Sequence, residues 1–162
     1  MGFSAYKAPD NGYTCQVPDG WEAQRFSTDA SALLLVKGAA GDPVTGLRPE
    51  PAVTISVRRY PAGNPYFKSS AEFIKAQGGA ARKIRDGARP GGWAFEEFEG
   101  SGKTFFPPND YNAKEISLRR RFLVLEKGAE FYVLEYAAPA DKFMAELPAF
   151  MTLSDTFRPS QP

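Results

Sequence analysis

Cys15 is the first residue whose type could do chemistry, because a thiolate is a nucleophile and a metal ligand. It lies in the stretch GYTCQVPDGW and is the only cysteine of the chain. No basic residue close to it in the sequence would lower its pKa, and no lipobox-like apolar run precedes it. We therefore predict an inert, semi-buried cysteine, since free cysteines are among the most buried residues.

Three consecutive arginines at 119–121 could bind phosphate. In a strand, however, side chains alternate, so Arg120 points away from its two neighbours. Antiparallel pairing with the preceding strand would place Glu96, Glu97 and Glu99 near these arginines as cross-strand ion pairs. We predict a self-neutralised sheet face and no nucleic-acid site.

Other chemical motifs are incomplete. Glu97 and Glu99 share a strand face, but nothing near them in the sequence marks an acid–base pair. The stretch GSGK lacks the G-x-x-x-x-G-K-[ST] spacing of a phosphate-binding loop, and NDYN is too sparse for a calcium loop. The chain has no histidine, the commonest general base and transition-metal ligand. We expect no catalytic, cofactor-binding or metal-ligating residue and therefore no enzyme.

The strongest binding signal is the aromatic stretch SGKTFFPPNDYNAKE, which we interpret as a long surface connection. Two adjacent phenylalanines are hard to hide in a loop. One alternative is that a phenylalanine packs under the sheet edge as a lid. The other is a partner contact surface that includes the NPYF turn, if both loops lie at the same end of the molecule. The candidate contact residues are Phe105, Phe106, Tyr111, Tyr66 and Phe67.

Composition places these residues in one domain over 1–162, since 162 residues with 43% hydrophobic content can bury a substantial core. Twenty Lys and Arg against nineteen Asp and Glu give a net charge of +1, so no global field favours nucleic acid or an anionic membrane. No apolar run approaches the roughly 18 residues of a membrane-spanning helix. We expect 1–12 to be flexible, and either a native start or a replacement for a removed export signal fits its polar composition.

Hydrophobic alternation and turn residues indicate the strands. Tyr13, Cys15 and Val17 share one face of a strand that ends at a Pro-Asp-Gly turn, after which Trp21 should anchor the next strand in the core. Residues 38–51 are rich in Gly and Pro and predict a loop. Further strands are expected at 32–37, 52–60, 92–99, 115–126 and 130–137, the last three as sequential antiparallel neighbours.

Two helices are expected. Ser69 and Glu72 have the spacing of a capping box, and Gly78-Gly79 suits the end of a short helix that places Phe73 and Ile74 against the sheet. The second helix follows PADK and contains Pro148, which implies a kink or two helical pieces. Its helically spaced residues are Phe143, Leu147, Phe150, Met151 and Ser154. The order of elements predicts an α+β fold with helices covering an antiparallel sheet.

These motifs together resemble the PsbP-like family. The resemblance covers nearly the whole chain and rests on a Tyr-x-x-x-x-Pro-x-x-Trp opening, the capped central helix, the aromatic strand at 93–98 and an aromatic ending. The ending comprises Tyr132, Leu134, Tyr136, Ala138, Pro139, Phe143, Phe150 and Phe157. The resemblance implies the α/β/α sandwich of PsbP-like and Mog-type proteins, whose members bind other proteins without an established common catalytic site. Metal binding proposed for photosynthetic members does not carry over, because the chain has no histidine.

Two hypotheses for function follow. The first is a non-catalytic binding protein of the bacterial cell envelope, periplasmic or derived from a lipoprotein, with a possible lipid anchor in the precursor. The second is a cytoplasmic chaperone or adaptor, similar to type VI secretion effector chaperones, that holds an apolar client segment on its aromatic strands EFYVLEY and GWAFEEF. Both predict a protein partner, and an enzyme ranks behind them.

Overall fold

The computed structural model describes residues 2–26, 28–38, 41–45, 47–48, 50–77, 81–107 and 110–160. Within them, one antiparallel sheet has seven strands in the order β3-β4-β5-β9-β8-β7-β6, and a second has three in the order β1-β2-β10. The strands are β1 Phe3–Lys7, β2 Tyr13–Pro18, β3 Glu22–Phe26, β4 Asp29–Lys37, β5 Val53–Tyr60, β6 Arg82–Arg89, β7 Trp93–Phe106, β8 Lys114–Lys127, β9 Glu130–Pro139 and β10 Arg158–Pro159. The helices are α1 Ser70–Ala76 and α2 Phe143–Thr156.

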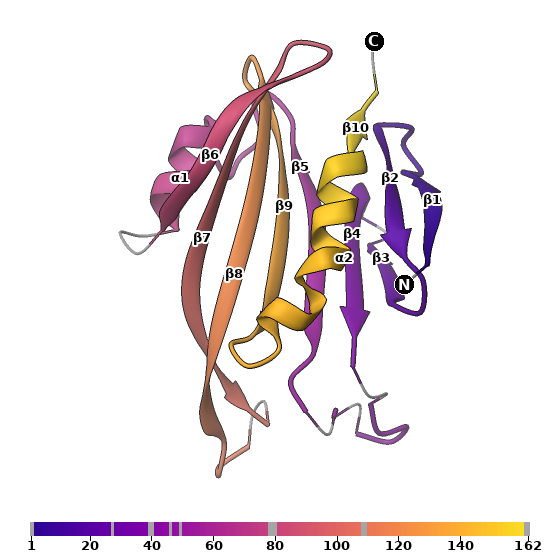
Figure 1. Cartoon of the computed structure of the whole chain (residues 1–162), viewed down its shortest axis with the longest axis vertical. Helices are drawn as coiled ribbons and strands as arrows, with labels where there is room; N and C mark the ends of the chain where they lie inside the picture. The colour runs from indigo at the N-terminus through magenta and orange to yellow at the C-terminus, as the bar shows by residue number, and fades with distance from the viewer. Residues whose placement is uncertain are drawn as a thin grey trace.

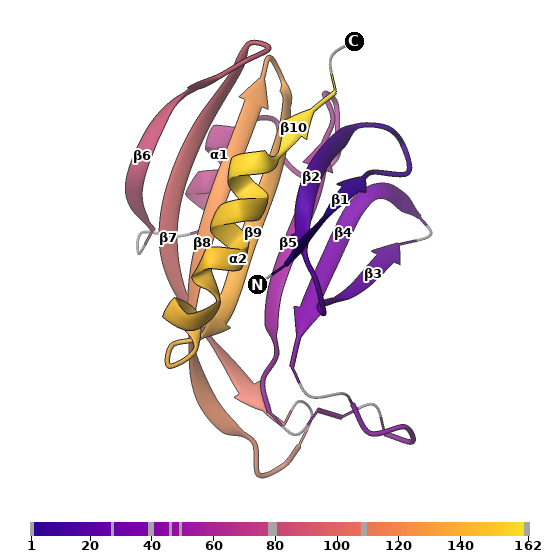
Figure 2. The ribbon, with the colours of Figure 1, turned by 45° about the vertical axis from the view of Figure 1, so that its right-hand side comes forward.

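The elements form three layers, with the seven-stranded sheet in the middle (Figures 1 and 2). Helix α2 and the three-stranded sheet cover one face, while α1 lies on the other. This arrangement confirms the predicted α+β class with helices flanking an antiparallel sheet.

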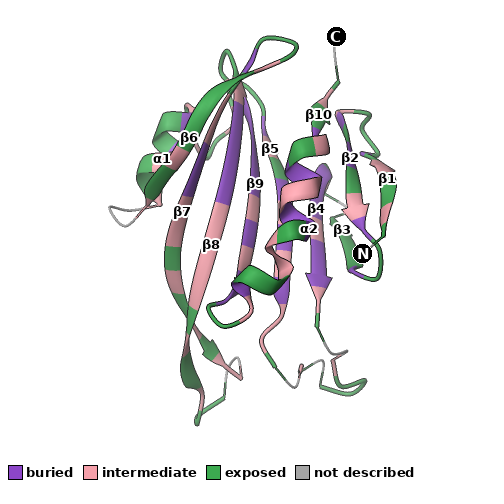
Figure 3. Cartoon of the chain, viewed as in Figure 1, coloured by how far each residue is buried: buried purple, intermediate pink, exposed green. Residues whose placement is uncertain are grey.

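The larger core lies between α2, β2 and the sheet face that we call the α2 face. Strand alternation directs apolar side chains to it: Ile55 and Val57 from β5, and Leu134 from β9, are all at most 1% exposed. Tyr13 packs edge-on against Tyr132 and lies 4.8 Å from the ring of Phe157, which ties β2 to the end of α2. Figure 3 shows the buried residues concentrated in the middle of the sheet.

The opposite face, which we call the α1 face, carries a smaller aromatic cluster. Phe73 of α1 packs against Phe131 and Phe122, and Phe98 stacks on Phe122 at 4.7 Å. Because α1 has only seven residues, it covers only part of the α1 face. The remaining part of this face does not belong to the aromatic cluster.

Both helices follow the sequence signals in their main features. The Ser69 side chain accepts a hydrogen bond from the Glu72 amide, as a capping residue should, whereas Gly78 and Gly79 lie outside the described residues. The second helix is continuous through Pro148, so the alternative of two helical pieces is wrong. Its buried residues are Phe143, Ala149, Phe150, Leu153 and Ser154. Of the helically spaced residues, Leu147 and Met151 are half-buried.

The aromatic stretch at 101–115 is part of a hairpin, which corrects the expected long connection. Strands β7 and β8 stay paired through Phe105↔Glu115 and Phe106↔Lys114, so the connection between the two strands comprises residues 107–113 only. The prediction of a long connection was wrong because the hydrophobic alternation fades at the glycines at 100 and 102, whereas the backbone hydrogen bonds between the two strands continue past them.

Three strands were not expected from the sequence. Strand β6 has only exposed or half-buried residues because it forms one edge of the sheet, so it shows no hydrophobic alternation. Strand β10 has two residues. Strand β1 pairs with β2 from Phe3↔Pro18 to Lys7↔Thr14, so the expectation of a flexible 1–12 segment does not hold for these five residues.

Candidate functional site: a groove on the α1 face

The charged residues of β7 and β8 neutralise one another on the α2 face. Arg121 contacts Glu97 and Glu99 at 3.1 Å, and Arg119 reaches Glu99 at 3.6 Å. Arg85 of β6 adds a second guanidinium to Glu97, at 2.5 Å. This confirms the predicted ion pairs for two of the three acids, but Glu96 is opposite Val124, on the other face, and was wrongly included.

Cys15 lies in the larger core with 4% of its surface exposed. Burial raises the pKa of its thiol to about 12, so the thiol stays protonated at neutral pH. The predicted burial is therefore confirmed, and the thiol lacks the exposure and low pKa of a reactive cysteine.

The five predicted contact residues lie in two separate places. Phe105 and Tyr111, at the β7–β8 hairpin tip, are 59% and 101% exposed, and Phe106 is half-buried. Tyr66 and Phe67 follow the end of β5 at Tyr60, which pairs with Phe131. The tip instead extends beyond the pairing of Leu118 with Pro139, at the other end of the sheet (Figure 1). The condition that both loops lie at one end is therefore not met.

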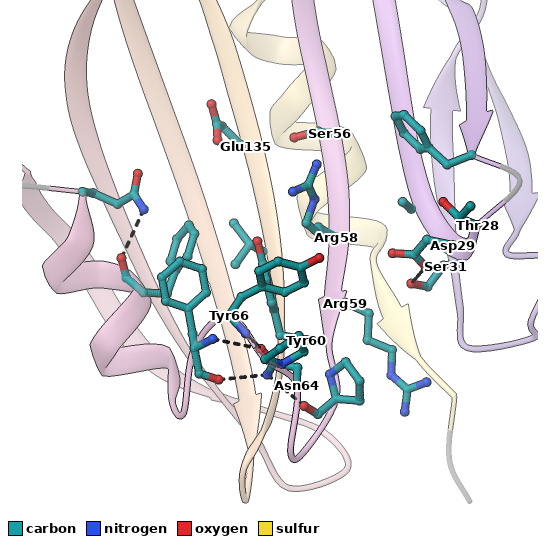
Figure 4. Close-up of a pocket in the computed structure, with 18 of the residues that line it drawn as sticks. Thr28, Asp29, Ser31, Ser56, Arg58, Arg59, Tyr60, Asn64, Tyr66 and Glu135 are labelled. Atoms are coloured by element: carbon teal, nitrogen blue, oxygen red, sulfur yellow. Dashed lines mark hydrogen bonds between the residues drawn. The ribbon is translucent and has the colours of Figure 1, made fainter.

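Tyr66 and Phe67 instead form one wall of an open groove of about 900 Å³ on the α1 face, beside α1. Figure 4 shows its residues, with Arg58 between the tyrosines of this wall and the Thr28, Asp29 and Ser31 group of the opposite wall. The lining comprises Phe26, Thr28, Asp29, Ser31, Ala32, Ser56, Arg58, Arg59, Tyr60, Pro61, Asn64, Pro65, Tyr66, Phe67, Phe73, Gln77, Arg120, Val133 and Glu135.

Asn64 fixes the loop that forms the aromatic wall. Its side-chain amide donates to the carbonyls of Pro61 and Phe67, and its side-chain oxygen accepts from the amides of Tyr66 and Phe67, all at 2.9 Å. The Phe67 ring packs edge-on against Tyr60 and Phe73, at 5.4 and 5.2 Å. These contacts order the loop while Tyr66 remains 73% exposed.

The groove floor is polar in its central part. Ser56 and Arg58 come from β5, and Glu135 comes from β9. Arg120 of β8 donates to Glu135 at 3.0 Å and lies over the ring of Phe122 at 4.8 Å. The Arg58 side chain is exposed and has no ion pair, hydrogen bond or ring contact with the described residues.

The wall opposite Tyr66 comes from the β3–β4 edge of the sheet. Phe26, the last residue of β3, is 42% exposed. Asp29 accepts hydrogen bonds from the Ser31 amide and hydroxyl at 3.0 and 2.6 Å. The groove therefore combines an exposed cation on its floor with exposed aromatic rings on both walls.

Sequence reasoning found Tyr66 and Phe67 but missed the rest of the groove. Its lining comes from segments up to about a hundred positions apart, Phe26 to Glu135, so no local motif marks it. One signal was present: Ser56 and Arg58 alternate with the buried residues of β5. A polar second face on a central strand indicates a surface that no helix covers.

In the described ranges, no group of three or more His, Cys, Asp or Glu side chains is placed to hold a metal ion. No helix within the described part of the chain is long and apolar enough to span a membrane.

Comparison with solved structures shows that the chain has the PsbP/Mog-like fold. The Ran-binding protein Mog1p of Saccharomyces cerevisiae is similar with a TM-score of 0.53 and 9% identity, over 98% of this chain and 95% of Mog1p. Cyanobacterial PsbP (CyanoP) from Synechocystis sp. PCC 6803 has a TM-score of 0.49 and 12% identity, over 98% of this chain and 92% of CyanoP.

A protein from Bacteroides thetaiotaomicron is similar with a TM-score of 0.54 and 12% identity over 99% of this chain. This chain spans 50% of that protein's length. No protein-family model and no curated protein sequence matches the chain. At such low identities the likeness concerns the fold alone.

Proposed function

We propose that this protein is a non-catalytic binding protein and that the α1-face groove is its contact surface for a protein partner. The observation that carries the proposal is the combination of exposed Tyr66 and Phe26 on the walls with exposed Arg58 on the floor. Tyrosine, phenylalanine and arginine are the residues enriched at protein interfaces, and concave surfaces favour their burial. The Ran-binding function of the structural neighbour Mog1p supports a protein as the partner by analogy.

The test is quantitative affinity purification from the native organism with the wild-type chain and two matched pairs of variants. The groove variants are Arg58→Glu and Tyr66→Ala, and the control variants are Lys114→Glu and Tyr111→Ala at the hairpin tip. Arg58→Glu and Lys114→Glu each reverse one exposed charge, and Tyr66→Ala and Tyr111→Ala each truncate one exposed tyrosine. We expect the groove variants to lower recovery of the partner at least tenfold, because truncated hot-spot residues cost about 2 kcal/mol or more.

A rival contact surface is the hairpin tip, which the exposure of Phe105 and Tyr111 favours. Loss of the partner with the tip variants, and not with the groove variants, would transfer the proposed function to the tip. Equal recovery with all four variants would contradict both surfaces.

The absence of catalysis is part of the proposal and has its own test. Hydrolase and transferase substrates are incubated with the purified protein, and no turnover is expected. Activity that disappears when one acidic residue is replaced would contradict the proposal.

The cellular location is also a proposal: the cell envelope, with the cytoplasmic chaperone as the alternative. Cell fractionation and N-terminal sequencing of the native protein distinguish them. The envelope proposal predicts the protein in the periplasmic or membrane fraction with a processed N-terminus, whereas the chaperone proposal predicts it in the cytosol.

A further inference from the structure

Arg58 differs from the other two arginines that line the groove. Arg59 is paired with Glu130 at 2.7 Å, and Arg120 with Glu135 at 3.0 Å. Within the described residues, no acidic side chain neutralises Arg58, although it lies on the concave face between two aromatic walls. The groove therefore has one guanidinium whose five donors are available to a ligand.

From this we infer that the groove binds an extended peptide segment of the partner, in which an aspartate or glutamate pairs with Arg58 and a neighbouring aromatic or large apolar side chain packs on Tyr66. The inference rests on the proposed function and names the chemistry of the partner. A guanidinium and a carboxylate form two parallel hydrogen bonds, which gives direction as well as attraction.

Charge complementarity favours a carboxylate over a phosphate. The lining contains three arginines and two carboxylates, those of Asp29 and Glu135, and two of the arginines are already paired. After this pairing, one guanidinium, that of Arg58, and one carboxylate, that of Asp29, which accepts hydrogen bonds from Ser31, carry the remaining charges. The carboxylates of Asp29 and Glu135 repel a phosphate, with about two negative charges at neutral pH, more strongly than a carboxylate with one.

The floor favours a peptide over an acyl chain. Ser56, Arg58 and the ion pair of Arg120 with Glu135 present polar groups along it. An acyl chain would remove these groups from water without offering them hydrogen bonds, at a cost in free energy. A peptide backbone can instead donate to Glu135 and exchange hydrogen bonds with the Ser56 hydroxyl.

The width of the floor sets the length of the segment. Its residues come from four adjacent strands, β4, β5, β9 and β8. Neighbouring strands lie about 4.8 Å apart, so the floor is about 14 Å wide, which an extended segment of about four residues spans at roughly 3.3 Å per residue. Tyr66 and Asp29 lie on opposite walls (Figure 4), and Phe26 of β3 pairs with Asp29 of β4. Apolar side chains on either side of the acidic residue would therefore reach Tyr66 and Phe26.

The test begins with selection of phage-displayed random heptapeptides on the wild-type protein, on Arg58→Gln and on Lys114→Gln. Lys114 is an exposed cation at the hairpin tip, so its variant removes the same charge outside the groove. We expect the wild type and Lys114→Gln to enrich peptides with Asp or Glu within two positions of an aromatic or large apolar residue. Arg58→Gln should lose the preference for an acidic residue.

The strongest selected peptide is then synthesised with Glu, Gln, Lys or phosphoserine at the acidic position. For the wild-type protein we expect Glu to bind about tenfold more tightly than Gln, as for one charge-assisted hydrogen-bonded pair, and more tightly than phosphoserine. For Arg58→Glu the order should reverse, with Lys binding more tightly than Glu. An unfolded variant would lose binding of all four peptides, so a reversed preference for Lys over Glu would not arise from loss of folding.

Three results would overturn the inference. Enrichment of neutral peptides that still require Tyr66 would refute the acidic segment while leaving the groove as a protein-binding surface. Tighter binding of phosphoserine would assign the site to phosphopeptides. Selected peptides that bind Tyr66→Ala and Arg58→Gln as well as the wild type would refute any peptide site in the groove, and partner recovery with the groove variants tests the proposed function separately.

Discussion

Glu97 is a carboxylate with 2% of its side chain exposed, held between Arg85 and Arg121. Burying a charge costs free energy unless it is paired and hydrogen-bonded, and here two guanidinium groups supply the partners. The cluster therefore stabilises the β6–β7–β8 side of the sheet. Its buried acid has a structural explanation, and no catalytic role is needed to account for it.

We predict that Glu97→Gln lowers the free energy of unfolding by about 2–3 kcal/mol, because it leaves two guanidinium groups without their shared carboxylate. Urea denaturation measures the change. Glu96→Gln is the matched control, since Glu96 lies on the opposite face and has no ion pair among the described residues; it should change stability by less than about 0.5 kcal/mol. Equal effects of the two substitutions would contradict the ion-pair assignment.

Cys15 gives a second prediction for a single residue. Burial raises the pKa of its thiol to about 12, above the ordinary value of about 8.5, so at pH 8 the folded protein contains almost no thiolate. We expect Ellman's reagent to leave the native protein unmodified at pH 8 and to label one thiol per chain after unfolding in urea. Rapid labelling of the native protein would show that Cys15 is accessible and reactive.

The β7–β8 hairpin extends past the body of the sheet with both of its strands still paired. Its tip carries an aromatic residue, Tyr111, that is 101% exposed, and a second, Phe105, that is 59% exposed. These exposures favour a contact surface over a packed lid. A lid would bury one of the two phenylalanines against the sheet, and Phe106, the other phenylalanine of the pair, is only half-buried.

We therefore predict that Phe105→Ser and Tyr111→Ser each change Tm by less than about 2 °C, because little apolar surface is returned to water. Differential scanning calorimetry measures Tm. Phe122→Ala, at a ring that is 1% exposed, is the positive control and should lower Tm by about 10 °C. A loss of several degrees with Phe105→Ser would support the lid instead.

Local patterns predicted most of the fold of the whole molecule. The hydrophobic alternation of β5 and the capping signal of Ser69 can each be recognised from a few consecutive residues. The structure contains both the alternately buried strand and the capping hydrogen bond. Strand β6 was missed because an exposed edge strand has no buried face to impose alternation. The paired part of the hairpin tip was missed because the hydrophobic alternation fades at Gly100 and Gly102, whereas the backbone ladder continues past them.

The candidate site could be predicted only in part. Tyr66 and Phe67 stood out because two aromatic residues occurred in a turn. Phe26, Arg58 and Glu135 join them only because the sheet brings β3, β5 and β9 into one surface that α1 does not cover. Such a surface depends on strand order, which is a property of the whole molecule.

The central claim is that the α1-face groove contacts the partner, and site-specific photo-cross-linking in the native organism tests it most directly. A photoreactive phenylalanine derivative replaces Tyr66 in the groove, Tyr111 at the hairpin tip or Met144 on α2, all exposed by at least 65%. We predict one discrete cross-linked protein from position 66, lost when Arg58→Glu is added, and none from position 144. Cross-linking from position 111 or 144 but not from position 66 would contradict the claim.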